Sequence, residues 1–153
     1  MSKQHILEKI TENIQLQLNT MLEAARISHE ASTGDEAKAE SKYDTRGLEA
    51  SYLADAQAEQ CRLLTHSLQI FESLKLDYLP SGSAIEPGAL VEVQLDGTIC
   101  YYLLTPCAGG ITIEYEGFEL TTLSPEAPLY ENLLDHNIGD RLEQPAIMIL
   151  DIL

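Results

Sequence analysis

The strongest constraint on the fold is a change in the spacing of apolar residues near residue 80. Before that point apolar side chains recur every three or four residues, which is the period of an amphipathic helix. After it they alternate with polar residues, as in strands that bury one face. The segment 79–83, Leu-Pro-Ser-Gly-Ser, separates the two patterns and is rich in residues that end helices. The sequence therefore predicts an α+β protein whose helical part precedes a β-rich part.

The helical part contains two amphipathic stretches. The first runs from Ile6 to Ile27, and its stripe carries Leu7, Ile10, Ile14, Leu18, Met21, Leu22 and Ala25. The second runs from about Ser41 to Leu76, and its stripe carries Leu48, Tyr52, Ala56, Leu63, Leu64, Ile70, Phe71 and Leu74. Turn and cap formers at 32–36 separate them. Two such helices can hide their stripes only by packing antiparallel, so we expect a coiled-coil arm over 1–78 with its tip near 32–42.

The β-rich part reads as two hairpins, a short helix and a last strand. We expect strands at 89–95 and 98–104 around Asp96-Gly97, and at 111–115 and 118–122 around Glu116-Gly117. A helix is expected at 129–134, a turn at Gly139-Asp140 and a closing strand at 147–150. The aromatic residues that we expect to fill the core, rather than line a ligand pocket, are Tyr101, Tyr102, Tyr115 and Phe118. The sequence thus predicts an antiparallel β domain over 85–153, after a linker at 79–84.

The charge of the chain excludes some classes of partner. The formal net charge is −16, which repels phosphate backbones and anionic membrane surfaces. Residues 1–80 hold eight basic and 13 acidic side chains, whereas 81–153 hold one basic residue, Arg141, against 12 acids. We therefore expect no direct binding to nucleic acid or membrane, and a basic protein partner for the second half.

Neither a disulfide framework, a structural metal site nor a catalytic triad is predicted. The three cysteines are odd in number and form no CxxC pair, and the four histidines are scattered, none beside a serine or cysteine in a nucleophile setting. We expect no enzyme activity and no cofactor of the protein's own. The first residues do not resemble a signal peptide, and no stretch approaches the roughly 20 apolar residues that cross a bilayer, so we expect a cytoplasmic protein.

One segment of the β-rich part carries a resemblance to a known family. Residues 127–140, Ala-Pro-Leu-Tyr-Glu-Asn-Leu-Leu-Asp-His-Asn-Ile-Gly-Asp, are similar in spacing to the SPLxxALLGxxVGD signature of the GreA/GreB transcription factors. The positions kept in register are Pro128, Leu129, Leu133, Leu134, Gly139 and Asp140. These residue types begin a helix, bury its inner face and turn the chain, so they are scaffold positions. The resemblance implies an FKBP-like fold for 85–153.

A second resemblance lies at the expected tip of the arm. Residues 34–43, Gly-Asp-Glu-Ala-Lys-Ala-Glu-Ser-Lys-Tyr, resemble the family's GDxxENxxY. In the family, an Asp and a Glu three residues later help hold a second magnesium ion in the polymerase active site and promote cleavage of backtracked RNA. Here Lys38 stands three residues after Asp35, and the acids available are Asp35, Glu36 and Glu40. Of these, Asp35 and Glu40 are the candidate ligands of a Mg²⁺ ion shared with RNA polymerase. The alternative is a solvated helix start with capping carboxylates.

The residues after the tip are candidates for contact with a partner. The run 42–53 resembles a divergent branch of GreA/GreB-like proteins. Tyr43, Arg46 and Tyr52 fall where an exposed arm should be polar, and aromatic and arginine residues at such places often anchor partners. Packing of one helix on the other near Gly47 is the alternative use of these residues.

The resemblance implies a function for the whole chain. The acidic β domain would dock on RNA polymerase while the arm enters the secondary channel and modulates elongation or transcript cleavage. Three alternatives remain open: a channel regulator that does not promote cleavage, a peptidyl-prolyl isomerase built on the β domain, and a coiled-coil adaptor unrelated to transcription.

Overall fold

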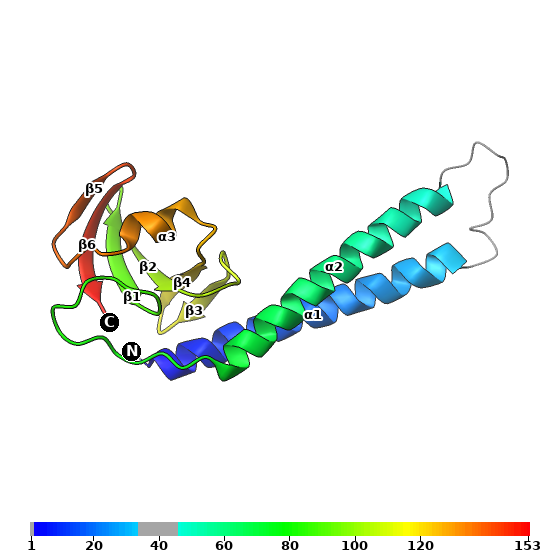
Figure 1. The fold of residues 1–153 in the computed structure, drawn as a ribbon, viewed down its shortest axis with the longest axis horizontal. Coiled ribbons are helices and arrows are strands. Elements are labelled where there is room, and N and C mark those ends of the chain that lie inside the picture. The colour runs from blue at the N-terminus through cyan, green and yellow to red at the C-terminus, as the bar shows by residue number, and fades with distance from the viewer. Residues whose placement is uncertain (1, 34–45) are drawn as a thin grey trace. The chain divides into compact units, whose positions relative to one another are not determined.

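The computed structural model describes residues 2–33 and 46–153 and contains three helices and six strands in these ranges (Figure 1). The helices are α1 (Lys3–Thr33), α2 (Arg46–Ser73) and α3 (Pro128–Leu133). The strands are β1 (Leu90–Leu95), β2 (Thr98–Leu104), β3 (Thr112–Tyr115), β4 (Phe118–Leu123), β5 (Arg141–Glu143) and β6 (Ala146–Ile152). Helices come first and strands follow, so the α+β prediction is confirmed.

The chain forms two compact units. One comprises Thr11–Glu72, and the other comprises Met1–Ile10 together with Ser73–Leu153. Helix α1 is continuous, and its first turns belong to the β-rich unit while the remainder belongs to the helical unit. The domain division expected from the sequence, with bounds at 78 and 85, stays a prediction.

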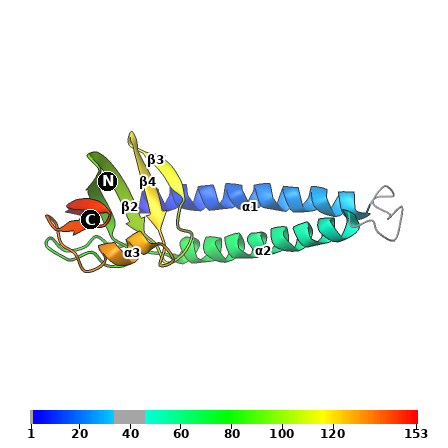
Figure 2. The ribbon, with the colours of Figure 1, turned by 90° about the horizontal axis from the view of Figure 1, so that it is seen from above.

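In the helical unit, α1 and α2 run side by side in opposite directions, as both views show (Figures 1 and 2). The buried apolar side chains that this unit contributes are Ile14, Leu18, Leu64 and Phe71. The stripe predicted for the second helix is wrong at Tyr52, Ala56 and Leu63, which are exposed. Helix α2 ends at Ser73, before the expected end at Leu76, and the expected start at Ser41 lies outside the described residues.

The six strands form one sheet in the order β3-β4-β2-β1-β6-β5. Both predicted hairpins are present, and their turns have positive φ at both central residues: 49° and 83° at Asp96-Gly97, and 50° and 88° at Glu116-Gly117. This is the conformation that Asn-Gly and Asp-Gly turns favour, because their backbone twist matches that of the strands. Two turns of the expected kind therefore fix the register of the two hairpins.

The prediction of an antiparallel domain is wrong for one pair of strands, because β2 and β4 are parallel. After β2, residues 105–111 carry the chain past the position beside β2, so β3 takes the edge of the sheet. Strand β4 then returns into the free position and runs in the same direction as β2. The other edge is strand β5, which the sequence did not predict. The sheet is therefore mixed, with both edges formed by short strands.

One face of the sheet packs against α3. The buried residues of this cluster are Ile85, Ala89, Val91, Val93, Leu104, Leu123, Tyr130, Leu133, Ile147, Ile149 and Ile152. Pro128 begins α3, where its missing N–H costs no helical hydrogen bond. Gly139 has a φ of 91°, and its N–H donates to the carbonyl of Ile149 at 2.9 Å. The scaffold roles expected for Pro128, Leu133 and Gly139 are thus confirmed.

The first turns of α1 contact strand β3 and the segment before β1. The backbone N–H of Ser2 donates to the hydroxyl of Tyr115 at 3.2 Å, and Lys9 Nζ donates to the carbonyl of Glu114 at 3.0 Å. Ile6 in the first turn is completely buried. The β-rich unit is therefore completed by residues from the opposite end of the chain.

Lys3 is buried within this contact, and only 1% of its surface is exposed. Its Nζ donates to the carbonyl oxygens of Asp77 at 2.8 Å and Gly88 at 3.0 Å, and lies 5.7 Å from the ring centre of Tyr78. Burial lowers the pKa of Lys3, while the nearby carboxylates of Asp77 and Glu86 act in the opposite direction. A single ammonium group thus ties the start of α1 to both ends of the segment between α2 and β1.

We expect Lys3→Ala to lower the free energy of unfolding by about 1–3 kcal/mol, because two carbonyl oxygens lose their donor in a buried place. Urea denaturation followed by circular dichroism measures this loss. Lys75→Ala removes an exposed lysine and should change the free energy by at most about 0.5 kcal/mol. Equal effects of the two substitutions would contradict the anchoring role of Lys3.

We expect Leu133→Ala to lower the free energy of unfolding by about 2–5 kcal/mol, because it leaves a cavity between α3 and the sheet. The same denaturation experiment applies. The control is Ile138→Ala, which truncates an exposed side chain after the same helix. A loss for Leu133→Ala no larger than that of the control would show that α3 does not pack as described.

Candidate functional site

The structure locates only part of the site predicted from the sequence. Asp35, Glu36, Glu40 and Tyr43 lie outside the described residues, so their predicted roles, including the Mg²⁺ ligands Asp35 and Glu40, remain predictions. Arg46 is the first residue of α2, and its side chain lies outside the description. Tyr52 is on α2 with 66% of its surface exposed. Exposure of Tyr52 is what contact with a partner requires.

Within residues 2–33 and 46–153, no group of three or more His, Cys, Asp and Glu residues is placed to hold a metal ion.

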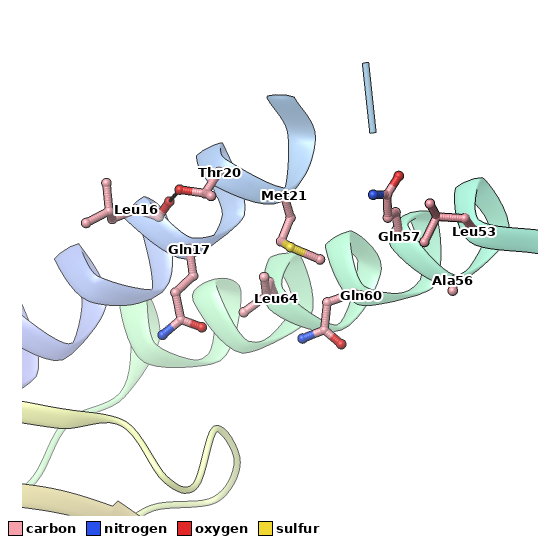
Figure 3. A pocket seen from close by; sticks show the side chains of 9 residues that line it. All are labelled: Leu16, Gln17, Thr20, Met21, Leu53, Ala56, Gln57, Gln60 and Leu64. Carbon is pink, nitrogen blue, oxygen red and sulfur yellow. Dashed lines mark hydrogen bonds between the residues drawn. The ribbon is translucent and has the colours of Figure 1, made fainter. Parts of the chain in front are cut away.

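A groove runs between α1 and α2 within the helical unit (Figure 3). Its volume is about 680 Å³. The lining residues are Leu16, Gln17, Thr20 and Met21 from α1, and Leu53, Ala56, Gln57, Gln60 and Leu64 from α2. The two helices thus leave space between them that their own side chains do not fill.

The groove has an apolar and amide surface. Leu64 is buried within the helical unit, whereas Leu16 and Leu53 are 66% and 54% exposed. The Oε1 atom of Gln57 is buried and has no hydrogen-bond partner among the described residues. Exposed leucines and an unpaired amide acceptor are both unfavourable in an isolated helical pair. This arrangement is suited to contact with another apolar and amide-bearing surface.

Two arginines of the helical unit pair with carboxylates of their own helices. Arg62 donates to the carboxylate of Glu59 at 2.6 and 2.9 Å, and Arg26 pairs with both Glu23 and Glu30. The hydrogen bond from Arg62 holds the pKa of Glu59 below its ordinary value, and Arg26 does the same for Glu23. Pairs this exposed contribute little to stability. The Arg62–Glu59 pair has no net charge, whereas Arg26 with its two glutamates retains one negative charge.

The surface of the β-rich unit is strongly acidic. Its exposed carboxylates include Asp96, Glu114, Glu116, Glu119, Glu126, Glu131, Asp135 and Glu143. Arg141 is the single basic residue among 81–153 and is also exposed. A surface of one sign attracts a partner of the other sign and accelerates the encounter. This unit is therefore suited to a basic protein surface.

The aromatic residues of the sheet are divided between its two faces. Tyr102 packs against the core on the α3 side, whereas Tyr101 and Phe118 contact each other on the opposite face with ring centres 4.1 Å apart. Phe118 also contacts Tyr115, which is buried. Burial raises the pKa of Tyr101, and the charge and hydrogen bond of Glu92 raise it further. The prediction that these residues fill the core is confirmed for Tyr115, which is buried. Tyr101, Tyr102 and Phe118 are partly exposed and line a hollow at β2 and β4, so for them the prediction is not confirmed.

Sequence reasoning missed both the groove and the buried Lys3. A signal for Lys3 was present, since Lys3, Leu7, Ile10 and Ile14 recur at helical spacing on one face of α1. The groove is reflected in Ala56 of α2, whose small side chain lines it. Neither signal identifies what the residues contact.

In the described part of the chain, no helix combines the length and apolar character needed to cross a bilayer.

Comparisons with known proteins give likenesses at the level of structure. No protein-family model matches the chain, and no curated protein matches it. The GreA factor homolog 1 (Gfh1) protein of Thermus thermophilus is similar, with 19% identity over 94% of each chain and a TM-score of 0.36. Gfh1 of Thermus aquaticus has 19% identity over 92% of each chain and a TM-score of 0.35. Another structure, of the transcription factor Gfh1, has 21% identity over 93% of this chain and 92% of that chain, with a TM-score of 0.37.

Proposed function

We propose that this protein binds RNA polymerase and modulates transcript elongation or cleavage through its helical pair. The observation that carries the proposal is the segment 127–140, which resembles the GreA/GreB signature and adopts the helix and turn expected from its residues. The acidic surface of the β-rich unit supports docking on a basic rim of the polymerase. In this proposal the protein acts in the cytoplasm and has no catalytic activity of its own.

The chemistry proposed for the tip needs little from this chain beyond carboxylates. A second Mg²⁺ ion in the polymerase active site lowers the pKa of its bound water and stabilises the charge that develops during RNA cleavage. Asp35 and Glu40 would bind this ion, and Glu36 would add negative charge beside it. The polymerase would supply the first metal ion, the RNA and the remaining groups.

Lys38, which departs from the GreA/GreB pattern, favours a second possible function, in which the protein regulates elongation without promoting cleavage. Lys38 occupies the position where the family has the second acid, and an ammonium group there opposes binding of a cation. A factor of this kind would occupy the secondary channel and slow elongation without promoting cleavage. The same experiment distinguishes the two outcomes.

The test is a transcript-cleavage assay on backtracked elongation complexes with the variant Asp35→Ala/Glu36→Ala/Glu40→Ala. If the tip acids bind the second Mg²⁺ ion, cleavage stimulated by the protein should fall at least about 100-fold, as when charge stabilisation is removed from a transition state. Polymerase affinity should change less than about threefold, because docking is carried by the β-rich unit.

The control replaces exposed acids of the helical unit that lie away from the tip in the sequence, with Glu12→Ala on α1 and Glu72→Ala on α2, and should leave stimulated cleavage intact. If the wild-type protein binds polymerase but stimulates no cleavage, the regulator that only occupies the channel is supported. If it shows no affinity for core polymerase, the proposed function is wrong.

The predicted contact at Tyr52 has a separate test. We expect Tyr52→Ala to weaken binding to core polymerase about tenfold, as loss of an aromatic anchor commonly does. Thermal stability should not change, because the side chain is exposed. Fluorescence anisotropy with labelled protein measures the affinity, and His66→Ala, at another exposed position on α2, is the control. Equal affinities for wild type and Tyr52→Ala would show that Tyr52 is not part of the interface.

A further inference from the structure

We propose that the groove between α1 and α2 is a self-association surface, occupied by the helical pair of a second copy of this chain. The groove leaves Leu16 and Leu53 exposed. A second copy would cover both leucines. The contact would be isologous, with the same residues contributed by each copy.

The absence of charge in the groove argues for a second copy. All nine lining residues are uncharged, although the chain has a net charge of −16. Two copies of so acidic a protein repel each other wherever their carboxylates meet. They can approach closely only through a surface without net charge. The groove is such a surface, and the adjacent Arg62–Glu59 pair is neutral as a unit.

The chemistry of the groove is complementary to itself. A glutamine side chain offers both a donor and an acceptor, so identical glutamines can pair across a two-fold axis. Two glutamines of the groove are exposed and available for such pairing, Gln17 and Gln60. Its exposed leucines likewise suit an identical apolar surface. A strongly charged partner helix would instead lose hydration against these residues without gaining an ion pair.

Self-association would compete with the proposed activity, and this consequence rests on the proposed function. The helical pair that would enter the secondary channel is the same element that the second copy would cover. Dimer and polymerase-bound monomer would then exclude each other, and the protein concentration would set the active fraction. Self-association itself is measured without polymerase, so failure of either proposal can be told from failure of the other.

The experiment is sedimentation velocity on the full chain from about 1 µM to about 500 µM, a range that brackets weak self-association. The mass should rise from 16.9 kDa toward twice that value with increasing concentration. Added salt should leave the association unchanged or strengthen it, since the groove is uncharged and the remaining surface is acidic. The double variant Leu16→Gln/Leu53→Gln should raise the dissociation constant at least about tenfold.

The matched control is Leu22→Gln/Leu63→Gln, which changes exposed leucines on the same two helices outside the groove lining. It should change the dissociation constant less than about twofold. Circular dichroism should show equal helix content for both double variants, since all four side chains are exposed. A mass that stays at 16.9 kDa over the whole range would overturn the proposal. Equal loss of association in the control variant would overturn it as well, because the interface would then lie elsewhere.

Discussion

Burial of the first turns of α1 is the interaction on which the β-rich unit depends. A mixed sheet has two faces, and α3 covers one of them with Tyr130 and Leu133. Residues Met1–Ile10 belong to the same compact unit and bring in the fully buried Ile6 and Lys3. The ammonium group of Lys3 satisfies two carbonyl oxygens in the segment between α2 and β1. Sequence-distant parts of the chain therefore meet in this unit, which makes it a product of non-local contacts.

The helical unit follows a different principle, because much of its apolar surface remains uncovered. Ile14, Leu18, Leu64 and Phe71 are buried, yet Leu16 and Leu53 remain exposed beside a groove that also holds three glutamines. Two helices offer each other only one stripe of contact, so apolar residues off that stripe need another partner. A second copy of the chain in the groove would cover these apolar residues. The polymerase channel would also cover them when the helical pair lies inside it.

In the proposed function, the two units differ in surface charge and therefore in the kind of contact that each makes. The acidic surface of the β-rich unit favours a basic docking surface, while the groove of the helical unit is uncharged. Electrostatic attraction acts over several ångströms and brings partners together, whereas apolar and amide contacts act only on contact. In the proposed mechanism the β-rich unit directs the protein to its partner, and the helical unit makes the regulatory contacts.

The sequence by itself determined the features that depend on near neighbours along the chain. Apolar spacing predicted the two long helices, the Asp96-Gly97 and Glu116-Gly117 turns predicted both hairpins, and the prolines before residue 129 predicted α3. Each depends on backbone preferences or on side-chain period within one segment, and these act locally. The candidate tip acids were also found from the sequence, through a resemblance, and they lie outside the described residues.

Only the tertiary structure decided which segments meet. The parallel pairing of β2 with β4, the edge strand β5, the burial of Lys3 and the groove beside Leu16 all depend on contacts between residues far apart in the chain. From the sequence alone, a lysine near the start of a helix is expected to be exposed to solvent. The structure shows that Lys3 is buried and that its ammonium group donates to two carbonyl oxygens. Local preference sets what each segment forms, whereas burial and the satisfaction of hydrogen bonds across the fold set where it lies.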